Sequence, residues 1–455
     1  MMKWRLFASI ALLPIVACAQ DITGPVAQVT EPIGSVIFPD SFKKPTDGSD
    51  DAPSIQRAMA ALCKRPGNAG TGGTVFLKPH VYEIGSNVTV PCALNMVGSG
   101  WEEQMTLGGG TWLHIVSSLG VSHSAFTLET TFARASQFSN FAISEDMPLP
   151  SKVPNTAWVP TAYKAVFGIK GVGAAVFFHH ILLDGVYEGI AAEGAGRIEL
   201  DGMYADPFHY LIRIDGSEDV DRIRNIHIWP YWTNATVSGS SQKMSMSQEQ
   251  RENVAAYKIK NTNGIILGRA DTPFLDDVFG IGLHSTIVFT NTGEDNTGDP
   301  TKVHIGKLSC DKSQYCLFID GSAKDTSAII DQIDWQGEDP MHTGMPNADG
   351  AAVRVEGGAL LQIGAVHAEF IGNSIFSMEN KSICSEIITQ SIWGNFLFSV
   401  SNASVVNMVS CEVGHHILKA SFYDGTKNRE SDTPKMVNGE GHFLLGMFSE
   451  QNWHK

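Results

Sequence analysis

The sequence is poor in charge, and most of its charge is negative. Only 18% of its 455 residues are charged, and 48 acidic residues against 32 basic ones give a net charge of -16. A negative field disfavours nucleic acid and anionic membrane surfaces as partners. We therefore expect no nucleic-acid partner, while the 43% of hydrophobic residues allow a large core.

Long apolar runs are missing beyond the first 20 residues, so we expect no transmembrane span. The N-terminus, MMKWRLFASIALLPIVACAQ, has basic residues, an apolar run and then small residues, which is typical of a secretory signal. Two forms stay open: a signal peptide of residues 1–19, or a lipoprotein signal of residues 1–17 that leaves Cys18 as a lipid anchor. The protein is then secreted, or is an outer-membrane or periplasmic lipoprotein.

The sequence also lacks the CxxC spacing of common zinc sites. Its seven cysteines are an odd number for an exported protein. If Cys18 is lipidated or removed, six remain, and they suggest disulfides. Proximity along the chain favours one pairing among many: Cys63–Cys92, Cys310–Cys316 and Cys384–Cys411.

Several catalytic motifs with fixed spacing are absent as well. There is no HExxH metal motif, no GxSxG nucleophile motif and no glycine-rich phosphate loop. Their absence argues against the enzyme classes that depend on them. The sequence predicts no cofactor, and it leaves the use of calcium open because no acidic motif indicates it.

The stretch DGSDDAPSIQRAMAAL, from Asp47 to Leu62, combines an acidic turn with a helical pattern. Apolar residues recur at the spacing of one helix face, and Asp50 or Asp51 is placed to cap the helix. Short β segments follow over residues 72–100, separated by Gly, Pro and Asn. Such short strands are typical of solenoid coils rather than of a sandwich.

These two stretches together resemble the N-terminal part of the pectate lyase superfamily, which includes polygalacturonase-like proteins. The shared pattern is DG..DDT.AIQ.A, then GGTV.LP.G.Y.I, then L.V...V.L.G.G. The chain departs from it at Ala52-Pro53 and at Lys78-Pro79-His80. The resemblance implies an all-β fold: a right-handed parallel β-helix, a solenoid, with a short N-terminal capping helix.

The rest of the chain agrees with this fold in its spacing. Short apolar segments recur every 20–30 residues or so, as expected of stacked repeats that bury one face each. We expect a proline-containing linker over residues 20–45 and a single β-helix domain over residues 46–455. The longest gaps, 145–165, 234–256 and 421–438, predict loops, and the second of them is expected to be mobile.

Carboxylates near the ends of coils are candidates for glycosidic-bond cleavage, which commonly uses two of them. Neighbouring coils stack about 4.8 Å apart, so acids on adjacent coils can approach each other. The alternative is that an Asp before Gly, as at Asp201, only forms a turn. The candidate catalytic residues are Asp201, Asp206, Asp334 and Glu369.

Aromatic residues gather in the segment IHIWPYW, residues 226–232, and exposed rings of this kind stack on sugars. The alternative is a hydrophobic plug beneath the following loop. Arg224 is placed either to bind a uronate carboxylate or to remain a solvated charge. The candidate substrate-binding residues are His209, Arg224, Trp229, Tyr231, Trp232 and Trp335.

We expect an exported protein that cleaves glycosidic bonds of an extracellular polysaccharide, as a hydrolase or as a lyase. The NTD, GHG and RIK motifs of polygalacturonases are missing, so that activity is not expected. In the lyase version, Arg224 or a neighbouring base removes the proton beside a uronate carboxylate. The alternatives are a glycan-binding surface β-helix without turnover and a phage tailspike-like depolymerase, which the signal sequence disfavours.

Overall fold

The computed structural model describes the part of the chain from residue 36 onward, with gaps. The described residues are 36–63, 71–102, 109–129, 131–171, 175–234, 236–237, 243–244, 246–291, 298–337, 350–369, 376–378, 383–393, 396–400, 405–416, 421–424 and 443–445. The expected signal and Cys18 lie outside them. Contacts divide the chain into residues 1–34 and residues 35–455, and the second unit is described below.

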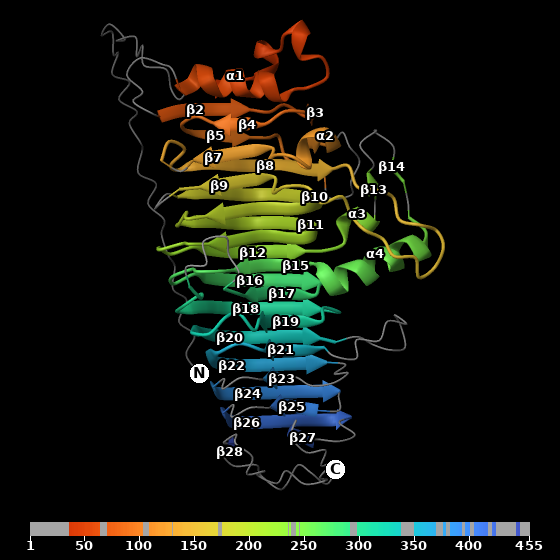
Figure 1. The fold of residues 1–455 in the computed structure, drawn as a ribbon, viewed down its shortest axis with the longest axis vertical. Coiled ribbons are helices and arrows are strands. Elements are labelled where there is room, and N and C mark those ends of the chain that lie inside the picture. The colour runs from red at the N-terminus through yellow and green to blue at the C-terminus, as the bar shows by residue number, and fades with distance from the viewer. Residues whose placement is uncertain are drawn as a thin grey trace, which may run out of the picture. The chain divides into compact units, whose positions relative to one another are not determined.

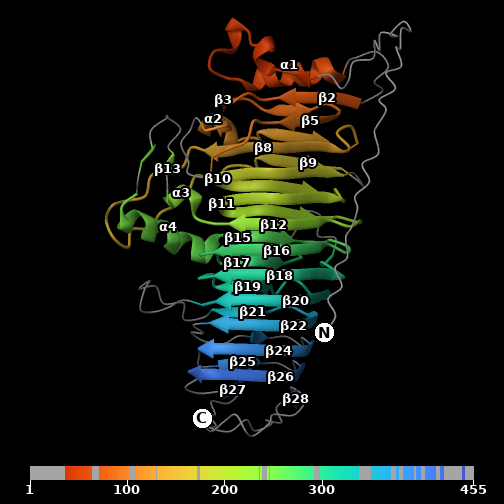
Figure 2. The same cartoon turned by 180° about the vertical axis from the view of Figure 1, so that it is seen from behind.

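Within these described ranges, twenty-six strands form one sheet, and every pairing between them is parallel. Both views show the strands stacked in chain order, one coil upon the next (Figure 1, Figure 2). The first coils contain β1 Val36–Ile37, β2 Thr71–Phe76, β3 His80–Ile84, β4 Val88–Val90, β5 Ala93–Val97 and β6 Thr111–Ile115. The fold predicted from the sequence, a parallel β-helix, is confirmed.

From β7 onward short and long strands alternate along the chain, except that β10 and β11 each join a long and a short part in one strand. The long strands are β8 Ser136–Glu145, β10 Val176–Glu193, β11 Ile198–Asp215, β12 Arg222–Ile228, β16 Phe274–Ile281, β18 Val303–Asp311, β20 Thr326–Gln336, β22 Ala359–Glu369, β24 Ile383–Trp393 and β26 Val405–His416. The short strands are β7 Phe126–Glu129, β9 Phe167–Lys170, β15 Asn263–Leu267, β17 Ser285–Phe289, β19 Tyr315–Ile319, β21 Ala351–Val355, β23 Phe376–Met378, β25 Phe396–Val400 and β27 Ser421–Asp424, and β28 is Phe443–Leu445. Because β10 and β11 each combine a long and a short part, β10 pairs with both β8 and β9, and β11 pairs with both β12 and β15.

A residue in the left-handed conformation bends successive long strands at one register position. The residues are Asn140, His180, Gly202, Asn225 and Asp277, with φ from 50° to 68°. Gly, Asn and Asp adopt this conformation most readily. The bend turns one face of each strand outward while alternate apolar side chains fill the interior, as in the stacked rings of Phe138 and Phe178, 5.4 Å apart.

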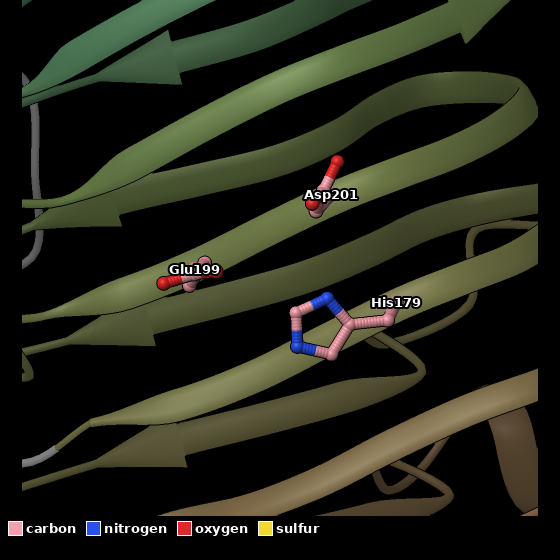
Figure 3. Close-up of side chains that lie close together, drawn as sticks. All are labelled: His179, Glu199 and Asp201. Atoms are coloured by element: carbon pink, nitrogen blue, oxygen red, sulfur yellow. The ribbon is translucent and has the colours of Figure 1, made fainter. Parts of the chain in front are cut away.

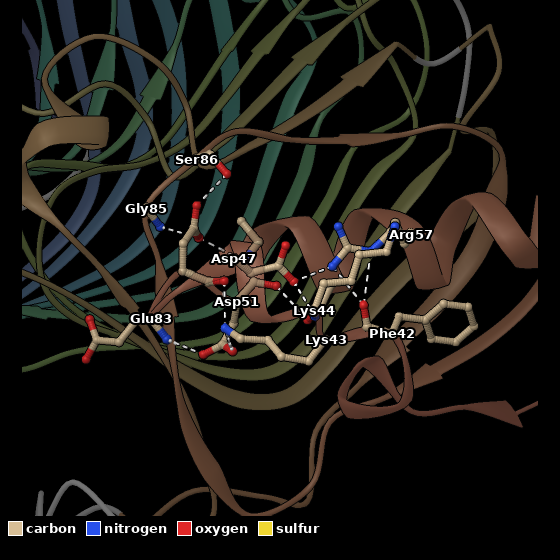
Figure 4. Close-up of polar contacts among 12 residues, drawn as sticks. Phe42, Lys43, Lys44, Asp47, Asp51, Arg57, Glu83, Gly85 and Ser86 are labelled. Atoms are coloured by element: carbon tan, nitrogen blue, oxygen red, sulfur yellow. Dashed lines mark hydrogen bonds and ion pairs between the residues drawn. The ribbon is translucent and has the colours of Figure 1, made fainter.

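The helix α1, Ala52–Cys63, lies beyond β2 at one end of the stack (Figure 1). Its apolar face is buried, and the acidic turn before it is held in place by hydrogen bonds (Figure 4). Asp50 accepts from the backbone N–H groups of Ala52 and Gly85, at 3.0 and 2.9 Å. Asp51 accepts from the N–H of Glu83 at 2.9 Å and pairs with Lys43 at 2.7 Å. Asp50 therefore accepts a hydrogen bond from the first residue of α1, and the helix covers the end of the solenoid, as the sequence predicted.

The preceding residues already belong to this body. β1 pairs with β2, and the short 3₁₀ helices η1, Pro39–Phe42, and η2, Pro45–Asp47, lead into α1. Asp40 forms an ion pair with Lys78 at 2.9 Å. Residues 36–45 of the predicted linker therefore lie against the first coil and α1.

Two of the three expected disulfides are present, Cys63–Cys92 and Cys310–Cys316. The β24–β26 register places Cys411 beside Thr389 and Cys384 beside Val406. The side chains of Cys384 and Cys411 lie outside the described residues. In the part that the structure describes, no helix is long and apolar enough to cross a membrane.

The insertion between β12 and β15, residues 229–262, carries most of the remaining helix, and we call it the roof. It contains α3 Tyr231–Asn234, β13 Thr236–Val237, β14 Lys243–Met244 and α4 Gln248–Asn261, whereas α2 Ser117–Gly120 lies near the first coils. α4 begins with a capping box between Ser247 and Gln250. The mobile loop expected over 234–256 is therefore a helix in its second half.

α4 also holds the loop that precedes β9. The side-chain amide of Asn253 donates to the carbonyls of Ser151 and Val153, both at 2.9 Å. Gln250 donates to the carbonyl of Pro150 at 2.8 Å. The views agree that α3 and α4 lie together on one side of the strand stack, alongside β10 to β15 (Figure 1, Figure 2).

Candidate functional site

The candidate site lies where the pairing of β10 with β11 is irregular, beside the roof. Its side chains on these two strands are those of Tyr187, Glu188, His209 and Tyr210. The register shifts between Asp184 and Val186 and again between Val186 and Glu188. Irregularities of this kind bend a strand and turn side chains away from the regular alternation. The two register shifts lie where the long part of each strand meets its short part, next to Tyr187 and His209.

His209 and Glu188 form a partly exposed pair at this point. The His209 Nδ1 lies 2.8 Å from the Glu188 Oε1, and the two side chains are 39% and 19% exposed. Glu188 also accepts a hydrogen bond from the hydroxyl of Tyr210. A carboxylate that accepts from the Nδ1–H of an imidazole fixes the ring and leaves Nε2 to accept a proton.

Two tyrosines stand beside the imidazole. The ring centroid of Tyr187 lies 5.2 Å from that of His209, and the hydroxyls of Tyr187 and Tyr257 are hydrogen-bonded. Tyr257 comes from α4 in the roof. Burial, followed by the charge of Glu188, raises the pKa of Tyr187, so its phenol stays protonated and can donate a proton.

Arg213 adds positive charge further along β11. Its Nη2 forms an ion pair with the Glu193 Oε1 at 3.6 Å and makes no hydrogen bond. Burial raises the pKa of Tyr210, and the charge of Arg213 opposes that rise. His209 and Tyr187 therefore supply an oriented base and a neutral acid, as general acid–base chemistry requires, and Arg213 adds a cation paired with Glu193 on the same strand as His209.

Asp201 and Arg224, both predicted from the sequence, are brought together on another face of the solenoid. Arg224 lies 3.0 Å from Asp201 and 3.3 Å from Glu199, because residues 199 and 201 point to the same side of β11. Asn225 donates to Asp201 at 2.6 Å. The predicted catalytic Asp201 and the predicted substrate-binding Arg224 are therefore paired with each other, on a different face from His209.

His179, on the neighbouring coil, lies beside the same two acids (Figure 3). One ligand atom each of His179, Glu199 and Asp201 falls within 4.8 Å of the others, a spacing that could hold a metal ion. The guanidinium of Arg224 already supplies positive charge to both carboxylates. His179, Glu199, Asp201 and Arg224 therefore form a charged network on the surface of the sheet.

Asp206, a predicted catalytic residue, is completely buried beneath the roof. It forms an ion pair with Lys258 of α4 and accepts from the backbone N–H of Trp232 at 2.8 Å. Burial raises the pKa of Asp206, and the charge of Lys258 opposes the rise. Because no substrate reaches it in this arrangement, its prediction as a catalytic residue is corrected to a structural one.

The aromatic segment divides into one exposed and two buried rings. Trp229 is 37% exposed, whereas Tyr231 and Trp232 are each 2% exposed. Trp232 packs against Trp158 and Phe208 under α4, with centroids 5.7 and 5.2 Å away. The prediction that Tyr231 and Trp232 bind sugar is therefore wrong, because both rings form the hydrophobic plug that was the alternative. Of these three rings, only that of Trp229 is exposed to solvent.

The remaining candidates lie farther along the stack. Asp334 accepts from Gln332 at 2.8 Å and lies 3.8 Å from Lys307, so its charge is partly neutralised. Trp335 is buried and donates to the carbonyl of Ser313 at 3.3 Å, which excludes the predicted sugar contact. The backbone of Glu369 pairs with Gln336, and its side chain lies outside the described residues.

Of the predicted residues, only His209 lies in the candidate site. Sequence reasoning missed Tyr187 and Glu188, which follow the glycine of LLDGVYEG, and Tyr257 in the roof. Strand alternation does not reveal them, because the irregularity in register changes which side chains face outward. The capping box SQEQ at the start of α4 was the signal that could have located Tyr257 on a helix.

The comparisons with known proteins identify the fold. No family model and no curated protein sequence matches the chain. The surface adhesin PfbA of Streptococcus pneumoniae is similar in structure, with 11% identity, a TM-score of 0.54 and coverage of 86% of this chain and 91% of that one. DFA-IIIase from Arthrobacter chlorophenolicus A6 in complex with GF2 has 12% identity, a TM-score of 0.47 and coverage of 83% and 85%. The chain has the right-handed parallel β-helix fold that its N-terminal sequence predicted.

Proposed function

We propose that this protein is an exported enzyme that cleaves a uronic-acid-containing polysaccharide by β-elimination, with His209 as the base. The observation that carries the proposal is the 2.8 Å contact between His209 and Glu188 beside a neutral tyrosine. The sequence left hydrolase and lyase open. An oriented imidazole suits the removal of a carbon-bound proton.

In the proposed step the His209 Nε2 takes the proton from the carbon next to the uronate carboxylate. The electron pair of that C–H bond forms a double bond to the adjacent carbon, and the bond from that carbon to the glycosidic oxygen breaks. Tyr187 donates its hydroxyl proton to the leaving oxygen and regains one through Tyr257. Arg213 is the proposed partner of the substrate carboxylate, because guanidinium groups bind carboxylates in two-pronged fashion.

The surroundings of two of the predicted acids, Asp201 and Asp206, favour elimination over hydrolysis. Hydrolysis by the common route needs two accessible carboxylates on either side of the bond. Asp201 is ion-paired with Arg224, and Asp206 is buried against Lys258. Neither acid supports a hydrolytic pair.

Export is supported by the disulfides Cys63–Cys92 and Cys310–Cys316, which form and persist in oxidising compartments. A lipid anchor at Cys18 and a secreted form remain two versions of this proposal. Incorporation of labelled fatty acid into the wild-type chain, but not into a Cys18→Ser variant, supports the lipoprotein. Release of unlabelled protein into the medium supports secretion.

The test of the activity is a panel of acidic and neutral polysaccharides incubated with the mature protein. We expect the ultraviolet absorbance of an unsaturated uronate from at least one acidic polymer and none from neutral ones. Reducing ends without that absorbance contradict elimination and support hydrolysis. Binding of a polysaccharide without new ends contradicts the enzyme and supports a glycan-binding surface protein.

A further inference from the structure

Two aspartates occupy the same register position on neighbouring coils beneath the roof. Asp184 of β10 pairs in register with Asp206 of β11, and both side chains are completely buried. Their surroundings differ. Asp206 pairs with Lys258 and accepts from the backbone of Trp232, whereas neither carboxylate oxygen of Asp184 has a hydrogen-bond partner.

Asp206 holds both helices of the roof to the solenoid. It binds α3 through the N–H of Trp232 and α4 through the ammonium of Lys258, which is only 3% exposed. Removing one partner of a buried ion pair leaves an uncompensated charge, so such a contact resists separation. Asp184 makes no hydrogen bond to either helix.

The residue next to Lys258 on α4 is Tyr257, whose hydroxyl is hydrogen-bonded to Tyr187. A shift of α4 would therefore move Tyr257 away from the proposed proton donor. We propose that Asp206 is a positioning residue: it holds α4 so that the Tyr257 hydroxyl stays against Tyr187. This inference rests on the proposed β-elimination.

The neighbouring aspartates give a matched pair of substitutions. Asp206→Asn and Asp184→Asn remove the same group at the same depth, and only the first should disturb α4. We expect Asp206→Asn to lower kcat on the cleaved polysaccharide about tenfold, the effect of losing roughly one hydrogen bond. We also expect it to speed hydrogen exchange in residues 248–261. Asp184→Asn should leave kcat and this exchange unchanged.

A double-mutant cycle separates positioning from general destabilisation. Tyr257→Phe should lower kcat about as much as Asp206→Asn, and the double variant should be no slower than either, because both act through one hydroxyl. Losses that add in the double variant overturn the proposal. So does an Asp184→Asn variant that loses kcat to the same extent.

Asp206→Asn leaves Lys258 buried without its partner, and the variant can fail to fold. The double variant Asp206→Asn with Lys258→Met removes the unpaired ammonium as well, so the effect on kcat can be measured in a folded protein. We expect this folded double variant to retain the tenfold loss of kcat, and full recovery would overturn the positioning role. A wild-type protein without cleavage overturns the proposed function and the catalytic role together, whereas faster exchange in Asp206→Asn alone still supports the anchoring of α4.

Discussion

The Nδ1 of His209 lies 2.8 Å from the Oε1 of Glu188, although 21 residues separate them along the chain. The two residues meet because β10 and β11 are consecutive coils and the register between them shifts just before Glu188. The contact gives the imidazole a fixed orientation at a partly exposed position. The proposed base chemistry depends on it.

Glu188→Gln tests that orientation. The amide keeps the size of the side chain but removes the charge that stabilises the protonated imidazole during the reaction. We expect kcat to fall about a hundredfold with a small change in KM, as measured on the cleaved polysaccharide. Glu199→Gln, at an acid of the separate charged network, is the control and should keep full activity. Equal kcat of the Glu188 and Glu199 variants would refute the proposed role of Glu188 in orienting His209.

Tyr187→Phe tests the proton donor. Because burial and the charge of Glu188 raise the pKa of Tyr187 above its ordinary value near 10, the phenol remains an acid throughout the neutral range. The wild type should therefore show no alkaline loss of kcat due to this group below about pH 10. The Phe variant should lose about a hundredfold in kcat. A variant that matches the wild type would exclude Tyr187 as the donor.

Asp184→Asn should make the protein more stable at neutral pH. Burial, followed by the charge of Asp206, raises the pKa of Asp184 well above its ordinary value. The folded protein therefore holds this proton more tightly than the unfolded chain, and the free energy of unfolding falls as the pH rises above about 4 toward the folded pKa. The Asn variant avoids that loss.

Urea unfolding at several pH values measures the effect. We expect the Asn variant to have the higher free energy of unfolding at pH 7 and to approach the wild type near pH 4. Ser144→Ala, on the preceding coil at the same register position, is a control for the loss of a buried polar group. A difference between Asp184→Asn and wild type that does not change with pH would contradict the assignment.

Arg224→Met should leave activity intact. Arg224 is 47% exposed, and solvent screens its ion pairs with Glu199 and Asp201, so each contributes little to stability. We expect a change below about 1 kcal/mol in the free energy of unfolding and unchanged kcat on the polysaccharide. Asp201→Asn should behave in the same way. Loss of cleavage in either variant would move the active site to this face.

The fold was predictable because its signals are local. The apolar spacing and acidic turn of residues 47–62 specify a capped helix, and short strands such as β4 and β7 alternate apolar and polar residues over a few positions. The left-handed bends occur at residues such as Asn140, Gly202 and Asn225, whose types favour that conformation. Such signals do not depend on distant contacts.

The site was mostly unpredictable because its contacts join distant segments. Trp232 is buried by Trp158, which lies 74 positions earlier, so the sequence around residue 232 does not reveal whether the ring is exposed. Asp206 looks like other coil-end acids until Lys258 is placed against it. The helix that carries Lys258 is held largely by polar side chains, so it lacks the apolar stripe by which helices are usually found.

The most direct test of the account compares wild-type protein with His209→Ala on an acidic polysaccharide, following the absorbance of the unsaturated product. We predict steady product formation by the wild type and a loss of at least about a hundredfold in the variant, with polysaccharide binding retained. Unsaturated product formed at the same rate by the variant would contradict the central claim that His209 removes the proton.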